Sequence, residues 1–97
     1  MVNVEIVAKE LIEDQRFRVE RLDIEECSIG DEGINILAEF ASQSPYLKFL
    51  NISNNNIKFE GMQLFCEWMM ETISLIVLFV HWNPIGHLGG MALAELL

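Results

Sequence analysis

The chain has few positive charges for its size. Its 97 residues include six lysines and arginines against fifteen aspartates and glutamates, a formal net charge of -9. Such an excess of acids repels a phosphate backbone, which excludes a nucleic acid as the partner. Hydrophobic residues make up 52% of the chain, enough to bury the core of one folded domain, so a disordered segment is also excluded.

Long apolar runs, a basic leader and a cysteine framework are missing as well. The longest apolar run, Ile73 to Val80, is interrupted by Ser74 and is shorter than the ~20 residues of a membrane span. We therefore expect no membrane or export signal. The two cysteines, Cys27 and Cys66, each sit inside an apolar pattern, which predicts free thiols and a reducing, cytoplasmic location.

What the chain does have is an internal repeat. An offset of 28 residues (47 minus 19) aligns like with like through most of the sequence. The aligned columns are, in chain order, Val19, Leu47 and Leu75; Leu22, Leu50 and Leu78; Ile24, Ile52 and Val80; Cys27, Asn55 and Asn83; Ile29, Ile57 and Ile85; Gly33, Gly61 and Gly89; and Leu37, Phe65 and Leu93.

Each repeat contains the signals of a short strand followed by a helix. Leu22 and Ile24 alternate with Asp23, as a strand with one buried face requires. The polar column that follows has to satisfy backbone groups where the chain turns, so Cys27, Asn55 and Asn83 are expected to stack as a structural ladder. The segment Gly30-Asp31-Glu32-Gly33 then offers acids to a helix N-terminus, and Pro45 is expected to end that helix.

From Val19 to Leu97 the columns follow the pattern L-x-x-L-x-L-x-x-N/C-x-L, and the chain resembles the ribonuclease-inhibitor-type leucine-rich repeats. The resemblance implies an α/β fold, a right-handed solenoid shaped as a short horseshoe with parallel strands on the concave side and helices on the convex side. We expect three repeats over residues 19–97, the last incomplete. Residues 1–18, with a helical pattern from Val4 to Ile12, are expected to form the N-terminal helix of a partial repeat.

The family's function, implied by the resemblance, is to bind a protein partner on the concave face. Strand residues between the buried columns are the expected contacts: Asp23, Glu25, Phe49, Asn51, Ser53, Phe79, His81 and Trp82. Exposed aromatic side chains often dominate binding energy, which favours Phe49, Phe79 and Trp82. In the alternative interpretation, Trp82 merely packs against the turn above Asn83.

Catalytic and metal-binding patterns are weak. His81 and His87 have no nearby cysteine or paired carboxylate, which argues against a zinc site or a nucleophile with its base. Cys66 stands where the first repeat has Ala38, so a buried inert thiol is expected. Helix capping explains Asp31 and Glu32 better than a cation site does. We expect no enzyme activity, no metal and no cofactor.

Two other functions and one property of the ends remain open. Repeats of this kind also occur in GTPase-activating proteins and in the ligand-sensing or autoinhibitory part of larger receptors, although the chain has no nucleotide-binding motif. Solenoid ends normally carry polar caps, whereas the last helix here stays apolar at Met91, Leu93, Leu96 and Leu97. Self-association through uncapped ends, or attachment to further repeats, is therefore expected.

Overall fold

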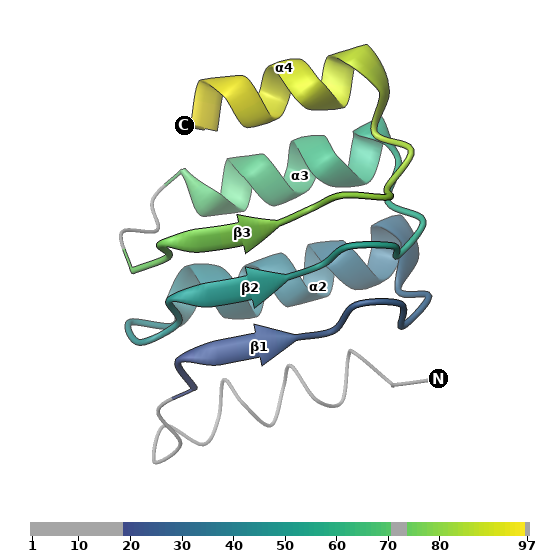
Figure 1. Ribbon diagram of the computed structural model, residues 1–97. Coiled ribbons are helices and arrows are strands. Elements are labelled where there is room, and N and C mark those ends of the chain that lie inside the picture. The colour runs from purple at the N-terminus through teal and green to yellow at the C-terminus, as the bar shows by residue number, and fades with distance from the viewer. Residues whose placement is uncertain (1–18, 71–73, 97) are drawn as a thin grey trace.

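The computed structural model describes residues 19–70 and 74–96, in which strands and helices alternate (Figure 1). The elements are β1 (Arg21–Asp23), α2 (Gly30–Gln43), β2 (Phe49–Asn51), α3 (Phe59–Met69), β3 (Val77–Phe79) and α4 (Gly86–Leu96). The expected helix of residues 1–18 lies outside the described residues. No helix among the described residues is long and apolar enough to cross a membrane.

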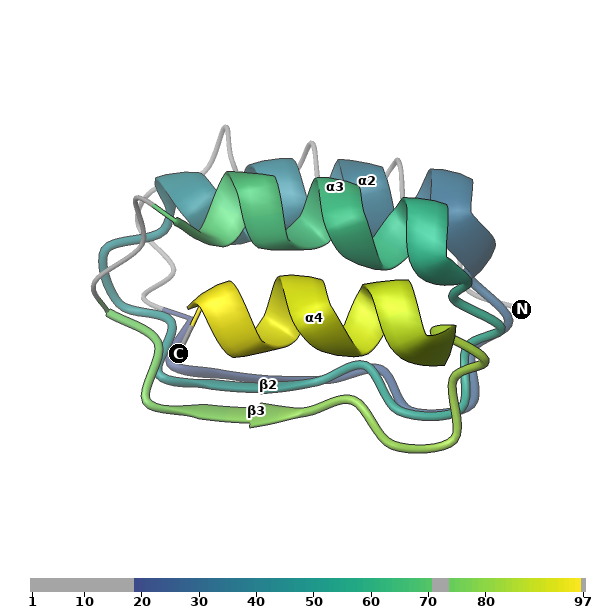
Figure 2. The ribbon, with the colours of Figure 1, turned by 90° about the horizontal axis from the view of Figure 1, so that it is seen from above.

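The three strands form one parallel sheet in the order β1-β2-β3, and the helices lie in a second layer beside it (Figure 2). Leu22 pairs with Leu50 and Leu50 with Leu78, so neighbouring strands are in register at the 28-residue offset of the sequence repeat. The expected α/β arrangement with parallel strands is confirmed. Each strand is three residues long. Glu25, which was expected among the strand residues, lies in the turn that follows β1.

The helices begin and end where local chemistry requires it. Asp31 and Glu32 lie in the first turn of α2, where their carboxylates meet the positive end of the helix dipole. The helix ends at Gln43, and the backbone of Ser44 is extended, as the residue before Pro45 should be. The expected stop at Pro45 is therefore confirmed.

Asp31 also contacts the start of the next helix. Its Oδ1 accepts a hydrogen bond of 2.7 Å from the backbone N–H of Lys58, which immediately precedes α3. The start of α3 has to approach closely for this contact, and a Cβ on Gly61 would lie 3.0 Å from the Cα of Asp31. The sequence predicted a capping role for Asp31 in its own helix, whereas the structure adds a link between two repeats.

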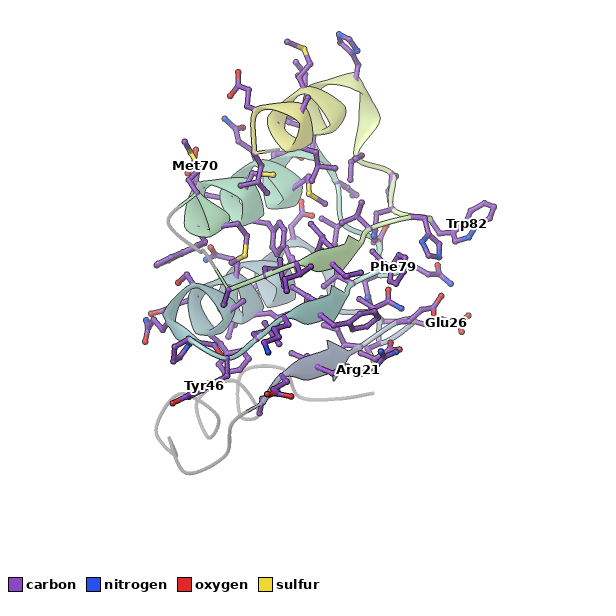
Figure 3. All side chains as sticks on the ribbon, turned by 60° about the vertical axis from the view of Figure 1, so that its left-hand side comes forward. Arg21, Glu26, Tyr46, Met70, Phe79 and Trp82 are labelled. Atoms are coloured by element: carbon purple, nitrogen blue, oxygen red, sulfur yellow. The ribbon has the colours of Figure 1, made fainter. Side chains whose placement is uncertain are left out.

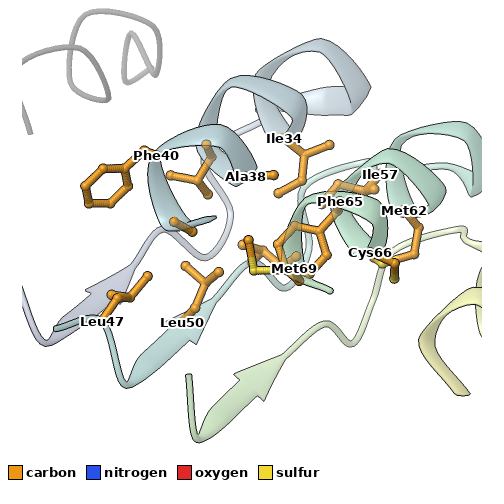
Figure 4. Close-up of a cluster of buried hydrophobic side chains, with 13 residues drawn as sticks. Ile34, Ala38, Phe40, Leu47, Leu50, Ile57, Met62, Phe65, Cys66 and Met69 are labelled. Atoms are coloured by element: carbon orange, nitrogen blue, oxygen red, sulfur yellow. The ribbon is translucent and has the colours of Figure 1, made fainter. Parts of the chain in front are cut away.

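The hydrophobic core lies between the two layers and is densest around the second repeat (Figure 4). Leu50 and Ile52 of this repeat are fully buried, whereas their counterparts in the third repeat, Leu78 and Val80, are only half-buried. A repeat buries its apolar columns completely when it has a neighbour on each side. The central repeat is therefore the best packed part of the described chain.

Candidate functional site

The turn after each strand is held by an asparagine ladder. Asn55 is buried, and its Oδ1 accepts a hydrogen bond of 2.8 Å from the backbone N–H of Cys27 in the preceding repeat. Its Nδ2 donates to the carbonyl oxygens of Ile24, Ile52 and Ser53 at 2.9–3.0 Å. One side chain thus satisfies backbone groups of two repeats, which aligns their turns.

The same contact recurs one repeat later. The Oδ1 of Asn83 accepts hydrogen bonds from the N–H groups of Asn55 (2.8 Å) and Ile57 (3.1 Å). In the first repeat, Cys27 stands in this column without an amide, and its Sγ lies 3.6 Å from the carbonyl oxygen of Glu25. The ladder residues are structural groups that position the turns.

The strands and these turns present what we call the sheet face, the side of the sheet opposite the helices. Its accessible side chains are Arg21, Asp23, Glu25, Phe49, Phe79, His81 and Trp82. Figure 3 shows Arg21, Phe79 and Trp82 on this side, away from Met70 at the end of α3. Acidic groups lie on the first repeat, and aromatic groups lie on the third.

A row of ring contacts runs across the sheet face. The guanidinium of Arg21 lies 3.8 Å from the centre of the Phe49 ring, a cation–π contact. Phe49 and Phe79 meet edge to face at 5.4 Å between centroids, and Phe79 meets His81 at 6.1 Å. These contacts join all three repeats and hold the aromatic side chains in fixed positions before any partner arrives.

Two of the expected contact residues are not accessible. Asn51 is 7% exposed and Ser53 is fully buried. Asn51 pairs with Asp23 on one side and Phe79 on the other, so its shorter side chain is covered by both neighbouring strands. Its Oδ1 accepts the N–H of Ser53 at 3.0 Å. The expectation that Asn51 and Ser53 face a partner is corrected: both support the turn.

A row of serine, histidine and glutamate, one from each repeat, was missed by the sequence analysis. Ser53 Oγ lies 3.0 Å from His81 Nδ1, and His81 Nε2 lies 3.8 Å from Glu25 Oε1. The offset of 28 residues that aligns the three positions was the available signal. Because Ser53 is fully buried, its hydroxyl cannot reach a substrate, so the row resembles a catalytic triad only in composition.

Trp82 has the most unusual environment on the sheet face. Its side chain is 78% exposed, which contradicts the alternative that it packs against the turn above Asn83. Its backbone φ is +60°, in the left-handed region that bulky residues rarely adopt. The column repeats this conformation at Glu26 and Asn54, so the turn imposes it and the third repeat places a tryptophan there nonetheless.

The rest of the described surface offers little chemistry. Within residues 19–70 and 74–96, no three histidine, cysteine or acidic side chains gather where they could hold a metal ion. Cys66 is buried in α3, and burial, with a smaller contribution from the charge of Glu67, raises the pKa of its thiol to about 11. A thiol in this environment stays protonated and unreactive at neutral pH.

Comparison with known proteins agrees with the geometry. No curated protein matches the chain. A family model described as Leucine Rich repeat matches residues 19–37 and 43–66, which carry the first two strands and most of the helices that follow them. The third strand and helix repeat the same register at the same offset. The chain is therefore similar to leucine-rich repeats over its first two strand–helix units, and the third unit continues the same register.

Proposed function

We propose that the chain is a protein–protein interaction module that binds its partner on the sheet face. Leucine-rich repeats generally mediate protein–protein interaction and are typically not enzymes. The observation that carries the proposal is Trp82, which is exposed to solvent in a backbone conformation that its own side chain disfavours. Neither packing nor local backbone preference explains this residue, whereas partner binding does.

The neighbours of Trp82 support a binding role. Phe79 is exposed beside it, and the row of ring contacts holds Phe79 and Phe49 in place, so little side-chain entropy is lost on binding. Asp23 and Glu25 add negative charge at the other side of the sheet face. The partner we propose therefore combines an apolar group for the aromatic side with a basic group for the acidic side.

The finer features belong to the same proposal. We take the repeats to be of the ribonuclease-inhibitor type, wound as a right-handed solenoid whose concave side is the sheet face, and the protein to act in the cytoplasm. Regulation of a GTPase is the weaker candidate. A protein that accelerates GTP hydrolysis can do so by supplying an arginine to the reacting phosphate. Arg21 is the one arginine among the described residues, and its guanidinium already contacts the Phe49 ring.

The test compares two variants that remove exposed apolar side chains from different parts of the surface. The double variant Phe79→Ser, Trp82→Asn changes the sheet face, and its asparagine is the residue that the second repeat has at this turn. The control, Met70→Ser, changes a 71% exposed side chain at the end of α3. Proteins captured from cytosolic extract are identified by mass spectrometry, purified, and titrated against each form.

We expect the double variant to lose about thirtyfold or more in affinity and the control to lose almost nothing, as for residues at the centre of an interface. Far-UV circular dichroism should be the same for all three proteins, since the changed side chains are exposed. Equal affinity of the wild type and the double variant would show that the partner binds elsewhere.

A further inference from the structure

The edge of β3 that faces away from β2 carries backbone groups that have no partner within residues 19–70 and 74–96. The N–H of Ile24 donates to the carbonyl of Asn51 at 3.0 Å, and the N–H of Ile52 donates to the carbonyl of Phe79 at 2.9 Å. The next residue in this column is Val80, and for its N–H the described residues supply no acceptor. An unpaired strand edge of this kind is a template for another strand.

A carbonyl on the same edge completes the template. The carbonyl oxygen of Lys48 accepts the N–H groups of Ile76 and Val77 at 2.8 and 3.0 Å. Ile76 stands one repeat later in this column, and its own carbonyl has no donor within residues 19–70 and 74–96. The edge therefore offers a donor at Val80 and an acceptor at Ile76, placed symmetrically two residues on either side of Leu78.

On the same end, helix α4 has no neighbouring helix other than α3 among the described residues. In α2, the Oδ1 of Asn35 accepts a hydrogen bond of 2.9 Å from Trp68 of the neighbouring helix α3, so this column faces the following helix. Its counterpart in α4 is Met91, which is 51% exposed. Leu88 is 59% exposed and stands where the first two helices have glutamates. We call Ile76, Leu78, Val80, Leu88 and Met91 the open end.

The open end carries little charge compared with the rest of the chain. The whole chain carries a formal charge of -9, yet residues 74–96 contain a single acid, Glu95, and no lysine or arginine. The opposite end of the sheet, at β1, exposes Asp23 and Glu20. Two copies of an acidic protein repel least where both are uncharged, which favours contact between like ends over a head-to-tail contact.

We propose that the open end binds the open end of a second copy of this chain. A two-fold axis through Leu78 pairs β3 of the two copies antiparallel, so that Val80 N–H of each copy donates to the carbonyl of Ile76 of the other. The α4 helices then lie side by side and bury Leu88 and Met91. The sheet face remains accessible in such a dimer, so this proposal is independent of partner binding there.

The test measures the oligomeric state of the full chain by sedimentation equilibrium over a wide range of protein concentrations. The variant Leu88→Glu, Met91→Gln introduces the residues that α3 has at the same positions, Glu60 and Gln63, so it suits the fold. The control Leu64→Gln removes an exposed leucine of α3 that lies away from the open end. Amide hydrogen exchange of Val80 is followed at low and high concentration.

We expect the wild type and the control to dimerise and the double variant to dissociate about tenfold or more weakly. We also expect exchange at the Val80 amide to slow as the wild type dimerises, and the helical circular dichroism of the variant to be unchanged. A wild type that stays monomeric overturns the proposal. So does a dimer that the double variant leaves intact, or one in which Val80 exchanges as fast as in the monomer.

Discussion

Asn83 does for Asn55 what Asn55 does for Cys27: in each case a side-chain Oδ1 accepts the backbone N–H of the residue one repeat earlier, at 2.8 Å. These hydrogen bonds hold each turn in line with the turn of the preceding repeat. It places Glu25 and His81 within 3.8 Å of each other although they are two repeats apart in the sequence. The turns of the sheet face therefore depend on the side-chain amides of Asn55, which is buried, and Asn83, which is half-buried.

Replacing Asn55 with alanine should destabilise the fold by about 2–4 kcal/mol, because the N–H of Cys27 and the carbonyl of Ile24 lose their partner in a poorly solvated place. The carbonyls of Ile52 and Ser53 each lose one of two donors. Asn83→Ala should cost less, since Asn83 is only half-buried and water reaches the groups it leaves. Urea unfolding followed by circular dichroism measures both. Equal losses would contradict the ladder as described.

Trp82→Asn should raise the free energy of unfolding by about 1 kcal/mol, because asparagine tolerates the left-handed backbone that tryptophan disfavours. Trp82→Ala serves as the matched control. It also removes the exposed ring, but its methyl group cannot form the local hydrogen bond that lets asparagine adopt the left-handed conformation. We expect thermal unfolding to separate the two variants. If alanine stabilises as much as asparagine, backbone strain is not stored at this turn.

Replacing two glycines with alanine should change the stability of the fold in opposite directions. Gly61→Ala is expected to cost about 1–3 kcal/mol, since the new methyl group meets first the carboxylate and then the backbone of Asp31 where α3 packs against the first repeat. Gly90→Ala should instead stabilise by about 0.5–1 kcal/mol, because nothing lies within 4 Å and alanine favours a helix. The denaturant midpoints of the two variants are compared with that of the wild type. A gain in stability for both would refute the close approach of Gly61 to Asp31.

The stability of the fold should fall between pH 9 and 11 through Cys66. Burial raises the pKa of its thiol from the ordinary value of 9.0 to about 11, so the folded state keeps a proton that the unfolded state loses in this window. The contribution is fully present below pH 9 and is lost as the pH rises, up to about 3 kcal/mol.

Cys66→Ala provides the comparison, since Ala38 has the same place in the first repeat. Other groups titrate at alkaline pH in both proteins, so the difference between their stability curves isolates the thiol. We expect the variant to lose less stability over this pH range. Parallel curves would show that Cys66 titrates alike in the folded and unfolded states.

Several features of the fold could be predicted from the sequence because they depend on local residue patterns. Leu22, Leu50 and Leu78 recur at one offset, and a strand centred on each pairs with the next in that register. Pro45 ends a helix through its own covalent geometry. Patterns of this kind specify the order of strands and helices and which face of each is apolar.

Accessibility could not be predicted in the same way. Ser53 and His81 stand in one column, yet the serine is fully buried and the histidine is exposed. Each residue follows a strand in which buried and exposed positions alternate in the same way, so the sequence pattern predicts the same exposure for both. What differs is the neighbourhood: the central repeat is covered from both sides, and the third from one.

The sequence by itself determined the repeat, its period and the alternation of strand and helix, because each depends on residues close together along the chain. The tertiary structure alone decided that Asn51 is covered, that Trp82 is exposed on a left-handed turn, and that the N–H of Val80 meets no acceptor among the described residues. These three properties depend on the size and backbone geometry of residues about one repeat away, and such residues meet only when the repeats stack.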